Sequence, residues 1–249
     1  MALQIGRGSG TSMHNHTAAQ VVVALSGKLQ VRMSPQASFS YCDAVLIPPK
    51  VNHRIIGSGS LEVMIWFDPA TIEARTIRLC TGSKLMPLSE GKIDIFQTQL
   101  SLLSSHLKTC EEAIELSKII TQTLLPKYKS IKLIDERIVS VLKAFQNSSL
   151  LSQPYPLKHL ANKVNLSEGR LRHLFRQELG VTIQQYWIGY RLLAAIRRFN
   201  SYMSLTEIAY ETGFADLAHF SHAFRASFGM TPSLAVKDSR YVQVMFCQD

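Results

Sequence analysis

The sequence lacks the marks of several common protein classes. Its four cysteines, Cys42, Cys80, Cys110 and Cys247, are scattered and contain no C-x-x-C pair, so neither a zinc ribbon nor a redox motif is expected, and free thiols are predicted. No apolar run approaches the ~18 residues that a membrane-spanning helix needs. The first residues are polar and glycine-rich, which predicts no secretory signal and a cytoplasmic protein.

Motifs of catalysis are also missing. We find no G-x-S-x-G elbow, no glycine loop that would cradle phosphate before a helix, and no pair of carboxylates beside the histidines. Gly6-x-Gly8-x-Gly10 precedes strand-like sequence and is interpreted as a flexible turn. The formal charge of +9 is spread along the chain, so it favours a polyanionic partner only weakly.

The N-terminal part of the chain has the pattern of short strands. Between residues 1 and 68 apolar residues alternate with polar ones, and glycine or proline interrupts them at short intervals. Val21–Leu25, Leu29–Met33, Ala44–Ile47 and Leu61–Phe67 are the clearest segments. This pattern predicts a small antiparallel barrel or sandwich.

Helix-forming residues dominate from about residue 90 to residue 147. One apolar stripe consists of Ala113, Leu116, Ile120 and Leu124, and a second of Ile134, Ile138, Val141, Leu142 and Phe145. Two interpretations remain open for these helices. They pack on the barrel or on the following domain, or the helices of residues 93–125 form a dimer seam.

The C-terminal part repeats one pattern after about 48 residues. Residues 160–166 recur as residues 208–214, and Leu171-x-x-Leu174-Phe175-Arg176 recurs as Phe220-x-x-Ala223-Phe224-Arg225. Each copy predicts a short helix, a tight turn and a second helix with one apolar stripe, which is a helix-turn-helix. A tandem pair of such units is typical of DNA-binding proteins.

Helix starts in this part are well marked. Pro156 suits a first helical position, Thr182 with Gln185 and Ser204 with Glu207 fit capping boxes, and Thr231 precedes Pro232. A helix over residues 183–203 would be ~30 Å long. Because successive major-groove faces lie ~34 Å apart, such a rod predicts a monomer that grips two of them.

The outward positions of the second helix in each unit are candidates for DNA contact. The helix N-terminal half enters the groove, and an arginine there suits guanine O6 and N7. The base-contact candidates are Gly169, Arg172, His173, Leu217, Ala218, His219, Ser221 and His222. The phosphate candidates are Lys163, Arg176 and Arg225.

Residues 156–238 resemble the DNA-binding domain of the AraC/XylS family of bacterial transcription regulators. The resemblance rests on Glu207-Ile208-Ala209-x-x-x-Gly213-Phe214, on Phe220-Ser221-x-x-Phe224-Arg225 and on Phe228-Gly229-x-Thr231-Pro232. It implies a seven-helix domain that binds asymmetric promoter sites. Gly169 stands where a side chain often reads a base, and Asn165 replaces the usual glycine of the first turn, where asparagine tolerates positive φ.

A second string, Gly8-x5-His14-x-His16-x3-Gln20-x6-Gly27, occurs near the N-terminus. His14, His16 and Gln20 share strand parity, and His53 could join them from another strand. This resembles the two motifs of the cupin barrel, whose metal ligands are three histidines and one glutamate. Gln20 replaces the carboxylate here, and Cys42 and Lys50 replace glycines of the second motif.

Three interpretations of the histidines remain open. His14, His16, Gln20 and His53 hold a divalent metal such as Zn²⁺, Ni²⁺ or Fe²⁺; they help a metal-free pocket with Trp66 to bind a small, aromatic effector; or they are a structural remnant. The whole chain resembles the short-cupin subgroup of the family. Few residues precede the first motif, so the barrel is expected to begin late.

The predicted protein is therefore an α+β two-domain transcription regulator, an activator or a repressor. We predict a cupin-like sensor barrel over residues 1–88, a helical linker or dimerisation segment over residues 89–130, and the DNA-binding domain over residues 131–249. The candidate partners are double-stranded DNA, a small effector, RNA polymerase and a second copy of the chain. The alternative is a metal-dependent cupin oxygenase or isomerase with a helical tail that binds a partner.

Overall fold

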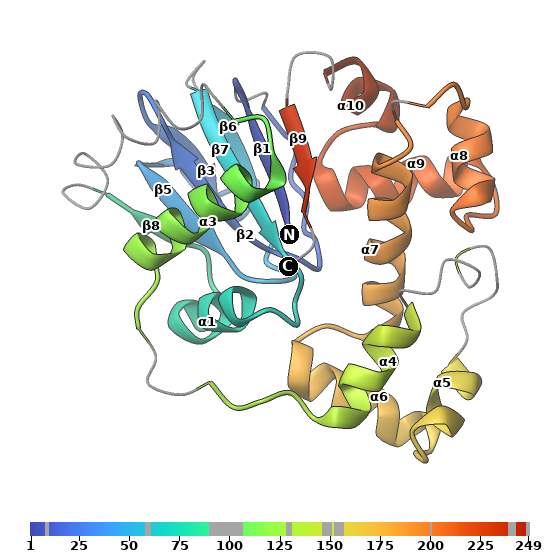
Figure 1. Cartoon of the computed structure of the whole chain (residues 1–249). Coiled ribbons are helices and arrows are strands. Elements are labelled where there is room, and N and C mark those ends of the chain that lie inside the picture. Colours follow the sequence, from blue (N-terminus) through green and yellow to red (C-terminus); the bar gives the residue numbers. More distant parts are fainter. Residues whose placement is uncertain are drawn as a thin grey trace.

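The computed structural model describes residues 1–7, 10–57, 61–89, 107–127, 131–145, 151, 157–199, 201–238 and 243–247. Seven strands come first along the chain. They are β1 (Ala2–Arg7), β2 (Ala19–Ala24), β3 (Leu29–Arg32), β4 (Ser40–Cys42), β5 (Ala44–Ile47), β6 (Arg54–Gly57) and β7 (Leu61–Phe67). Helix α1 (Ile72–Thr81), β8 (Met86–Leu88) and α3 (Cys110–Leu124) complete this part (Figure 1).

The strands form two sheets. One has the order β8-β5-β2-β7-β1-β9 and the other the order β4-β3-β6. The chain passes from one sheet to the other at Asp43, whose carboxylate lies 2.6 Å from Nζ of Lys28. The described strands thus form an antiparallel sandwich, one of the two predicted forms, and no ladder between the named strands joins the two sheets at their edges.

Both faces of the larger sheet are covered. Every residue of β2 is buried, which explains why Val21–Leu25 forms a continuous apolar run and does not alternate with polar residues. The smaller sheet covers one face through Leu29, Val31 and Ile55. Helices α1 and α3 cover the other, and the α3 stripe of Ala113, Leu116, Ile120 and Leu124 lies in that core (Figure 1).

The buried stripe of α3 agrees with the interpretation in which this helix packs on the sheet, and the dimer seam stays a prediction. The rest of the predicted dimer seam, residues 93–106, lies outside the described residues. None of the described helices is long and apolar enough to cross a membrane.

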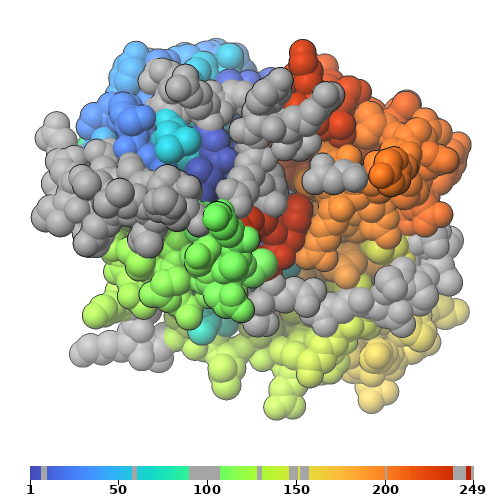
Figure 2. All heavy atoms as spheres, turned by 45° about the horizontal axis from the view of Figure 1, so that its top comes forward, coloured from blue at the N-terminus to red at the C-terminus, as the bar shows by residue number. Residues whose placement is uncertain are grey.

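The C-terminal segment returns to the N-terminal sheet. Strand β9 (Gln243–Phe246) pairs antiparallel with β1, so that Ala2 faces Phe246. The Met1 amino group donates to the Cys247 carbonyl oxygen, and the Cys247 amide donates to that of Met1. Figure 2 shows the red atoms of this segment between the green atoms of α3 and the orange atoms of the helical domain.

The prediction of four free thiols is wrong for two of them. Cys110 and Cys247 form a disulfide with their Cα atoms 5.4 Å apart, whereas Cys42 and Cys80 are free. The two bonded cysteines are separated by 137 positions. They meet because β9 pairs with β1 beside the first residue of α3, a long-range contact that cysteine spacing does not reveal.

Seven helices make up the described C-terminal domain. They are α4 (Glu136–Phe145), α5 (Leu157–Lys163), α6 (Glu168–Leu179), α7 (Ile183–Ile196), α8 (Leu205–Glu211), α9 (Leu217–Phe228) and α10 (Pro232–Asp238). Helix α7 joins two lobes, α4–α6 and α8–α10 (Figure 1). The second predicted stripe lies on α4, where Ile138, Val141 and Phe145 are buried in the first lobe.

The connecting helix is shorter than the sequence predicts. Helix α7 ends at Ile196, which gives about 21 Å where ~30 Å was expected. Hydrogen bonds of the tighter i→i+3 kind, from Arg198 to Ala195 and from Phe199 to Ile196, close its end. The predicted caps at Thr182, Ser204 and Thr231 are confirmed, whereas Pro156 lies outside the described residues.

Candidate nucleic-acid interface and histidine site

The first helix-turn-helix consists of α5, a turn and α6. Asn165 in the turn has φ 53°, which confirms that asparagine takes the left-handed conformation there. The Ser167 hydroxyl accepts a hydrogen bond from the Arg170 amide and caps α6. Leu171, Leu174, Phe175 and Leu179 are buried, as the apolar stripe predicts.

The second unit, α8 and α9, has the same construction. Gly213 takes φ 83° in the turn, where Asn165 stands in the first unit. Asp216 caps α9 by accepting from the His219 amide at 2.6 Å. Phe220 and Phe224 are buried, and Phe228 packs beside Phe224. Both units thus present one helix whose N-terminal half faces away from its own core.

The predicted DNA contacts lie on these outward faces. Ser221 is half-buried, and the other ten are exposed, namely Lys163, Gly169, Arg172, His173, Arg176, Leu217, Ala218, His219, His222 and Arg225. No atom lies within 4 Å of the position a Cβ would take at Gly169, so packing does not require glycine there.

Two features of these faces were not predicted. The Arg172 guanidinium forms an ion pair of 3.1 Å with Glu168, one turn earlier on α6. The Glu168 carboxylate thus orients the guanidinium group. His219 and His222 border the large cavity described below, because they lie on the side of α9 that turns towards the sheet domain.

Both outward helices are held by the sheet domain at their C-terminal ends. Arg78 on α1 donates to the Glu178 carbonyl oxygen at 3.0 Å, and a Cβ at Gly180 would lie 2.6 Å from the Arg78 guanidinium. At α9, the Ser12 amide and hydroxyl donate to the Gly229 carbonyl oxygen at 2.9 and 2.6 Å. Both glycines have positive φ and end their helices in the left-handed conformation.

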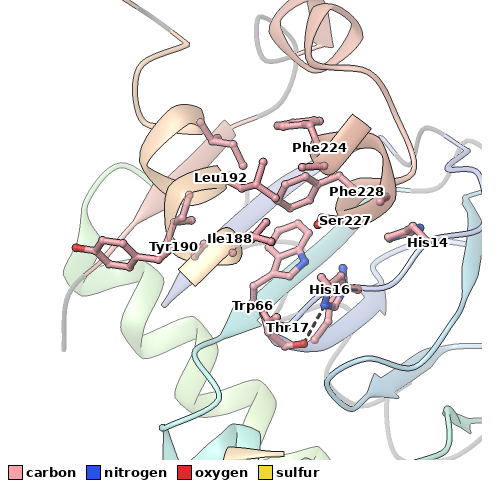
Figure 3. A pocket seen from close by; sticks show the side chains of 18 of the residues that line it. His14, His16, Thr17, Trp66, Ile188, Tyr190, Leu192, Phe224, Ser227 and Phe228 are labelled. Carbon is pink, nitrogen blue, oxygen red and sulfur yellow. Dashed lines mark hydrogen bonds between the residues drawn. The ribbon is translucent and has the colours of Figure 1, made fainter. Parts of the chain in front are cut away.

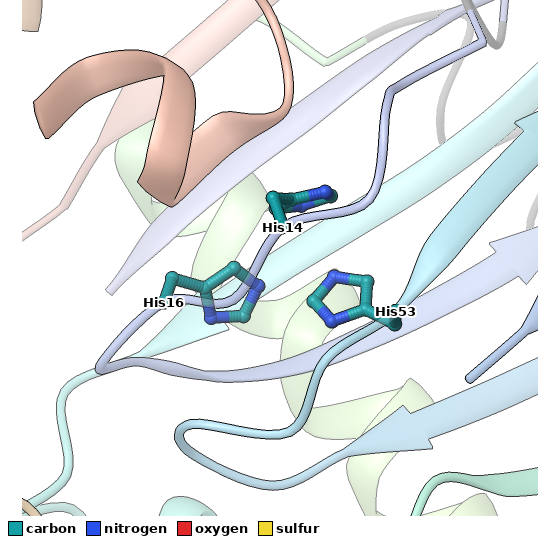
Figure 4. Close-up of side chains that lie close together, drawn as sticks. All are labelled: His14, His16 and His53. Carbon is teal, nitrogen blue, oxygen red and sulfur yellow. The ribbon is translucent and has the colours of Figure 1, made fainter. Parts of the chain in front are cut away.

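The predicted histidine set comes together in the sheet domain (Figure 4). One ring nitrogen from each of His14, His16 and His53 lies within 4.8 Å of the other two, and all three side chains are buried. An isolated antiparallel bridge outside the named strands pairs the backbones of His14 and His53. Gln20 joins them, since its Oε1 lies 3.0 Å from Nε2 of His16.

Backbone contacts fix the tautomer of each histidine. The Nδ1 atoms of His14, His16 and His53 lie 2.8 to 2.9 Å from the carbonyl oxygens of Ser12, Ala18 and Val51. A carbonyl can only accept, so each Nδ1 carries the hydrogen and each Nε2 presents a lone pair. Burial keeps the rings neutral, because it lowers the pKa of His14 to about 4 and lowers that of His16 and His53 as well.

This donor set fits a transition metal. The buried Nε2 of His53 has no hydrogen-bond partner, and Nε2 of His16 faces the Gln20 oxygen although both are acceptors. A cation bound between His16 Nε2 and Gln20 Oε1 would satisfy both acceptors. A Gln20 side chain flipped so that its NH₂ group donates to His16 would also do so. Imidazoles whose Nδ1–H is bound to a backbone carbonyl are the usual ligands of Zn²⁺, Ni²⁺ and Fe²⁺.

A cavity of about 500 Å³ lies between the sheet domain and the helices α7 and α9 (Figure 3). Trp66, Met64 and Phe67 line it from the sheet, and Ile188, Leu192 and Phe228 line it from the helices. His14, His16 and Gln20 border the same cavity. Trp66 was predicted to line a pocket with the histidines, whereas the wall that α7 and α9 form was not predicted.

Lys50 supplies a positive charge to this cavity. Its φ is 65°, the conformation of the glycine it replaces in the cupin pattern, and its amide donates to the His16 carbonyl oxygen at 2.8 Å. Burial lowers the pKa of its ammonium group. A strained residue that holds a half-buried charge in an apolar cavity is typical of a ligand site.

Comparisons with known proteins agree with this geometry. Residues 160–237 match a family model described as a helix-turn-helix domain. Over 233 residues, 88% of the chain and 90% of the relative, the chain is 27% identical to a probable transcriptional regulator LumQ of Photobacterium leiognathi. It is 36% identical over 99 residues to the transcriptional activator RhaR of Cronobacter sakazakii, and this match spans 39% of the chain and 34% of RhaR.

Solved structures of ToxT from Vibrio cholerae have the same fold. One apo form has a TM-score of 0.59 at 12% identity and covers 95% of the chain and 96% of ToxT. A second ToxT structure, with an unsaturated fatty acid bound, has a TM-score of 0.56 at 14% identity and covers 94% and 93% of the two chains.

Proposed function

The chain belongs to the AraC/XylS family of DNA-binding transcription regulators, and we propose that it reads an asymmetric operator with α6 and α9 in successive major grooves. The observation that carries this proposal is the pair of capped helices with buried inner stripes and exposed outer faces. We expect the protein to act in the cytoplasm and to change transcription through RNA polymerase bound nearby.

The roles of individual residues follow from their positions on the two helices. On α6, Arg172 and His173 read base edges at the exposed first turns, beside Gly169. On α9, Leu217, Ala218 and Ser221 take this role. Arg176 and Arg225, one turn further from the helix start, and Lys163 at the end of α5, bind phosphates. His219 and His222 are exposed on α9 and also border the cavity, so they can contact either the operator or a ligand.

The cavity binds the effector. Its apolar walls and the half-buried Lys50 favour an apolar molecule with one anionic group, and Trp66 offers an aromatic surface. Binding of an unsaturated fatty acid by ToxT, a protein of the same fold, supports this chemistry. A ligand in the cavity would touch both the sheet domain and α9, so it can shift the DNA-binding state.

The histidines serve sensing in this proposal. His14, His16, His53 and Gln20 would hold a divalent transition metal, which supplies a fixed positive charge and cross-links the strands that carry its ligands. The proteins of similar sequence are transcription regulators, and this favours a regulatory site over the cupin oxygenase or isomerase considered as the alternative.

Selection of bound genomic fragments by the purified full-length protein tests the proposal. We expect a small set of fragments that share an asymmetric motif, bound at least tenfold more tightly than random DNA of equal length. A variant with both Arg172→Ala and Arg225→Ala should lose this selection. Equal binding of all fragments by the unchanged protein would contradict sequence-specific reading.

Replacement of Lys50 tests the effector site. Lys50→Gly suits the positive φ and removes the charge, so the variant should fold and bind an unsaturated fatty acid at least tenfold more weakly. Lys84→Met, an exposed lysine outside the cavity lining, is the matched control. Unchanged binding of the acid by Lys50→Gly would remove Lys50 from the site.

A further inference from the structure

The disulfide between Cys110 and Cys247 joins one exposed and one buried cysteine. Cys110 is the first residue of α3 and is exposed, whereas Cys247 directly follows β9 and is buried. Their Cα atoms lie 5.4 Å apart, within the range that a disulfide needs. A small thiol or disulfide from solution therefore reaches the pair from the Cys110 side.

The other two cysteines are less suited to exchange. Cys42 is buried between the two sheets, and burial raises the pKa of its thiol to about 11. Cys80 is half-buried on α1, and burial raises the pKa of its thiol as well. Because the thiolate is the form that attacks a disulfide, both are poor nucleophiles at neutral pH. Solvent access distinguishes Cys110 from them.

The bond fastens a short edge strand. Strand β9 is the last strand of the larger described sheet and pairs with β1 alone (Figure 1). The two backbone hydrogen bonds between Met1 and Cys247 extend this pairing. Short edge strands near a chain end open at a low free energy. A covalent link to α3 therefore acts on an element that is weakly held without it.

Formation of the bond and docking of β9 depend on each other. A disulfide requires Cα atoms within about 7 Å, and Cys247 meets this condition with Cys110 while its amide donates to Met1. Docking thus favours the bond. Because coupling between two equilibria is reciprocal, the bond favours docking by the same factor. The oxidised protein must hold β9 on β1 more firmly than the reduced protein does.

Docked β9 also contributes to the cavity between the two domains. Phe246 lines the cavity beside Met1 and Ala2. The guanidinium carbon of Arg197, at the C-terminal end of α7, lies 5.3 Å from the centre of the Phe246 ring, a cation–π contact. The state of the cysteine pair therefore acts on one wall of the cavity and on the contact between β9 and α7.

We propose that Cys110 and Cys247 form a reversible thiol–disulfide exchange site, which small disulfides oxidise and small thiols reduce, and whose oxidation fastens β9 to the sheet. The inference goes beyond the proposed function and shares with it the expected cytoplasmic location. Disulfides in that compartment are usually transient, which suits a site that responds to the thiol pool.

The exchange proceeds in two steps. Cys110, as its thiolate, attacks one sulfur of a small disulfide such as glutathione disulfide and expels one thiolate. Cys247 then loses its proton to water and attacks the Cys110 sulfur, which expels the second thiolate. The protein gives up two electrons and two protons, and the small disulfide is reduced to two thiols. Reduction of the protein is the reverse of this sequence.

Equilibration of the full-length protein in glutathione buffers tests the exchange. Samples at a series of ratios of reduced to oxidised glutathione are quenched in acid, alkylated and mapped by mass spectrometry, with circular dichroism as the check of folding. The pair should convert completely and reversibly between the disulfide and two thiols, while Cys42 and Cys80 stay thiols. A pair that remains bonded at every ratio, or reduced at every ratio, overturns the proposal.

Hydrogen exchange of the fully oxidised and fully reduced samples tests the docking. Peptides that cover β9 should exchange on the order of tenfold faster in the reduced protein, because the edge strand opens more often. Peptides that cover β2, in the centre of the sheet, should not change. Equal exchange of β9 in the two states overturns the claim that oxidation fastens it.

Variants assign the effect to the pair. Cys110→Ser keeps a small polar residue at an exposed position, so it should fold, and in oxidising buffer β9 should exchange as in the reduced protein. Cys247→Ala breaks the same bond from the other side and should give the same result. Cys80→Ser keeps the pair and is the matched control. A response to the glutathione ratio that persists in Cys110→Ser overturns the assignment. Neither readout uses DNA or an effector, so failure of the proposed function is recognised separately.

Discussion

The Tyr186 hydroxyl on α7 donates a hydrogen bond of 2.7 Å to Oδ2 of Asp68, which directly follows β7. Oδ1 of the same carboxylate accepts from the Ala70 amide. Burial raises the pKa of Asp68 and that of Tyr186. This bond joins α7, the helix between the two helical lobes, to the sheet that lines the cavity.

Removal of this bond should loosen the two domains. We expect Tyr186→Phe to lower the free energy of unfolding by about 1–3 kcal/mol, because it leaves a buried carboxylate without one donor. Urea denaturation followed by tryptophan fluorescence measures the change. Tyr190→Phe, on the same helix, is the control. An effect of equal size in both variants would mean that the Asp68 contact contributes nothing specific.

Arg172→Ala should relax selectivity at one base pair of the operator. The lost bidentate contact costs roughly 1–3 kcal/mol on the preferred sequence and little on the sequence changed at that pair. Affinities for a set of operators with single substitutions measure this, and Arg176→Ala is the comparison. A uniform loss over the whole set in Arg172→Ala would assign that side chain to the phosphates.

Arg225→Ala should weaken all sequences about equally. A phosphate contact releases counterions, so the slope of log affinity against log salt should fall by about 1. Titrations at several salt concentrations, on the operator and on random DNA, give the two slopes. A loss confined to the operator would show that Arg225 reads a base.

Acid should destabilise the metal-free protein. Burial lowers the pKa of His14 from 6.5 to about 4, and charge on His16 lowers it further. Burial also lowers the pKa of His16, with a smaller effect of Lys50, and that of His53, with smaller effects of His16 and His14. Between pH 6.5 and 4 the histidines bind protons in the unfolded chain but not in the folded chain. The free energy of unfolding is therefore highest above pH 6.5 and falls as the pH approaches 4. Denaturation curves in a chelator between pH 7.5 and 4 check this. The variant His53→Gln should show a shallower fall.

Much of the DNA-binding domain could be predicted from the sequence because its signals are local. Capping at Thr182 and Ser204, the left-handed Asn165 and the buried stripe from Leu171 to Leu179 each depend on residues within one or two helical turns. The exposed face with Arg172 follows from the same periodicity.

The relations between the domains could not be predicted, since they depend on contacts across the whole chain. Nothing near Cys247 indicates that β9 pairs with β1 and brings this cysteine to Cys110. Gly229 indicates a helix end. It does not indicate that the Ser12 carbonyl oxygen lies where the Cβ of any other residue would be. Convergence of the histidines was predicted from strand parity, whereas the wall that α7 and α9 add to the cavity was not.

Hydroxyl-radical footprinting of the full-length protein on a selected operator tests most directly whether both helices read DNA together. Two protected segments centred about 10–10.5 base pairs apart, on one face of the duplex, are expected. Arg172→Ala should weaken one segment and Arg225→Ala the other. A single protected segment that both variants weaken equally would contradict the tandem reading of successive grooves.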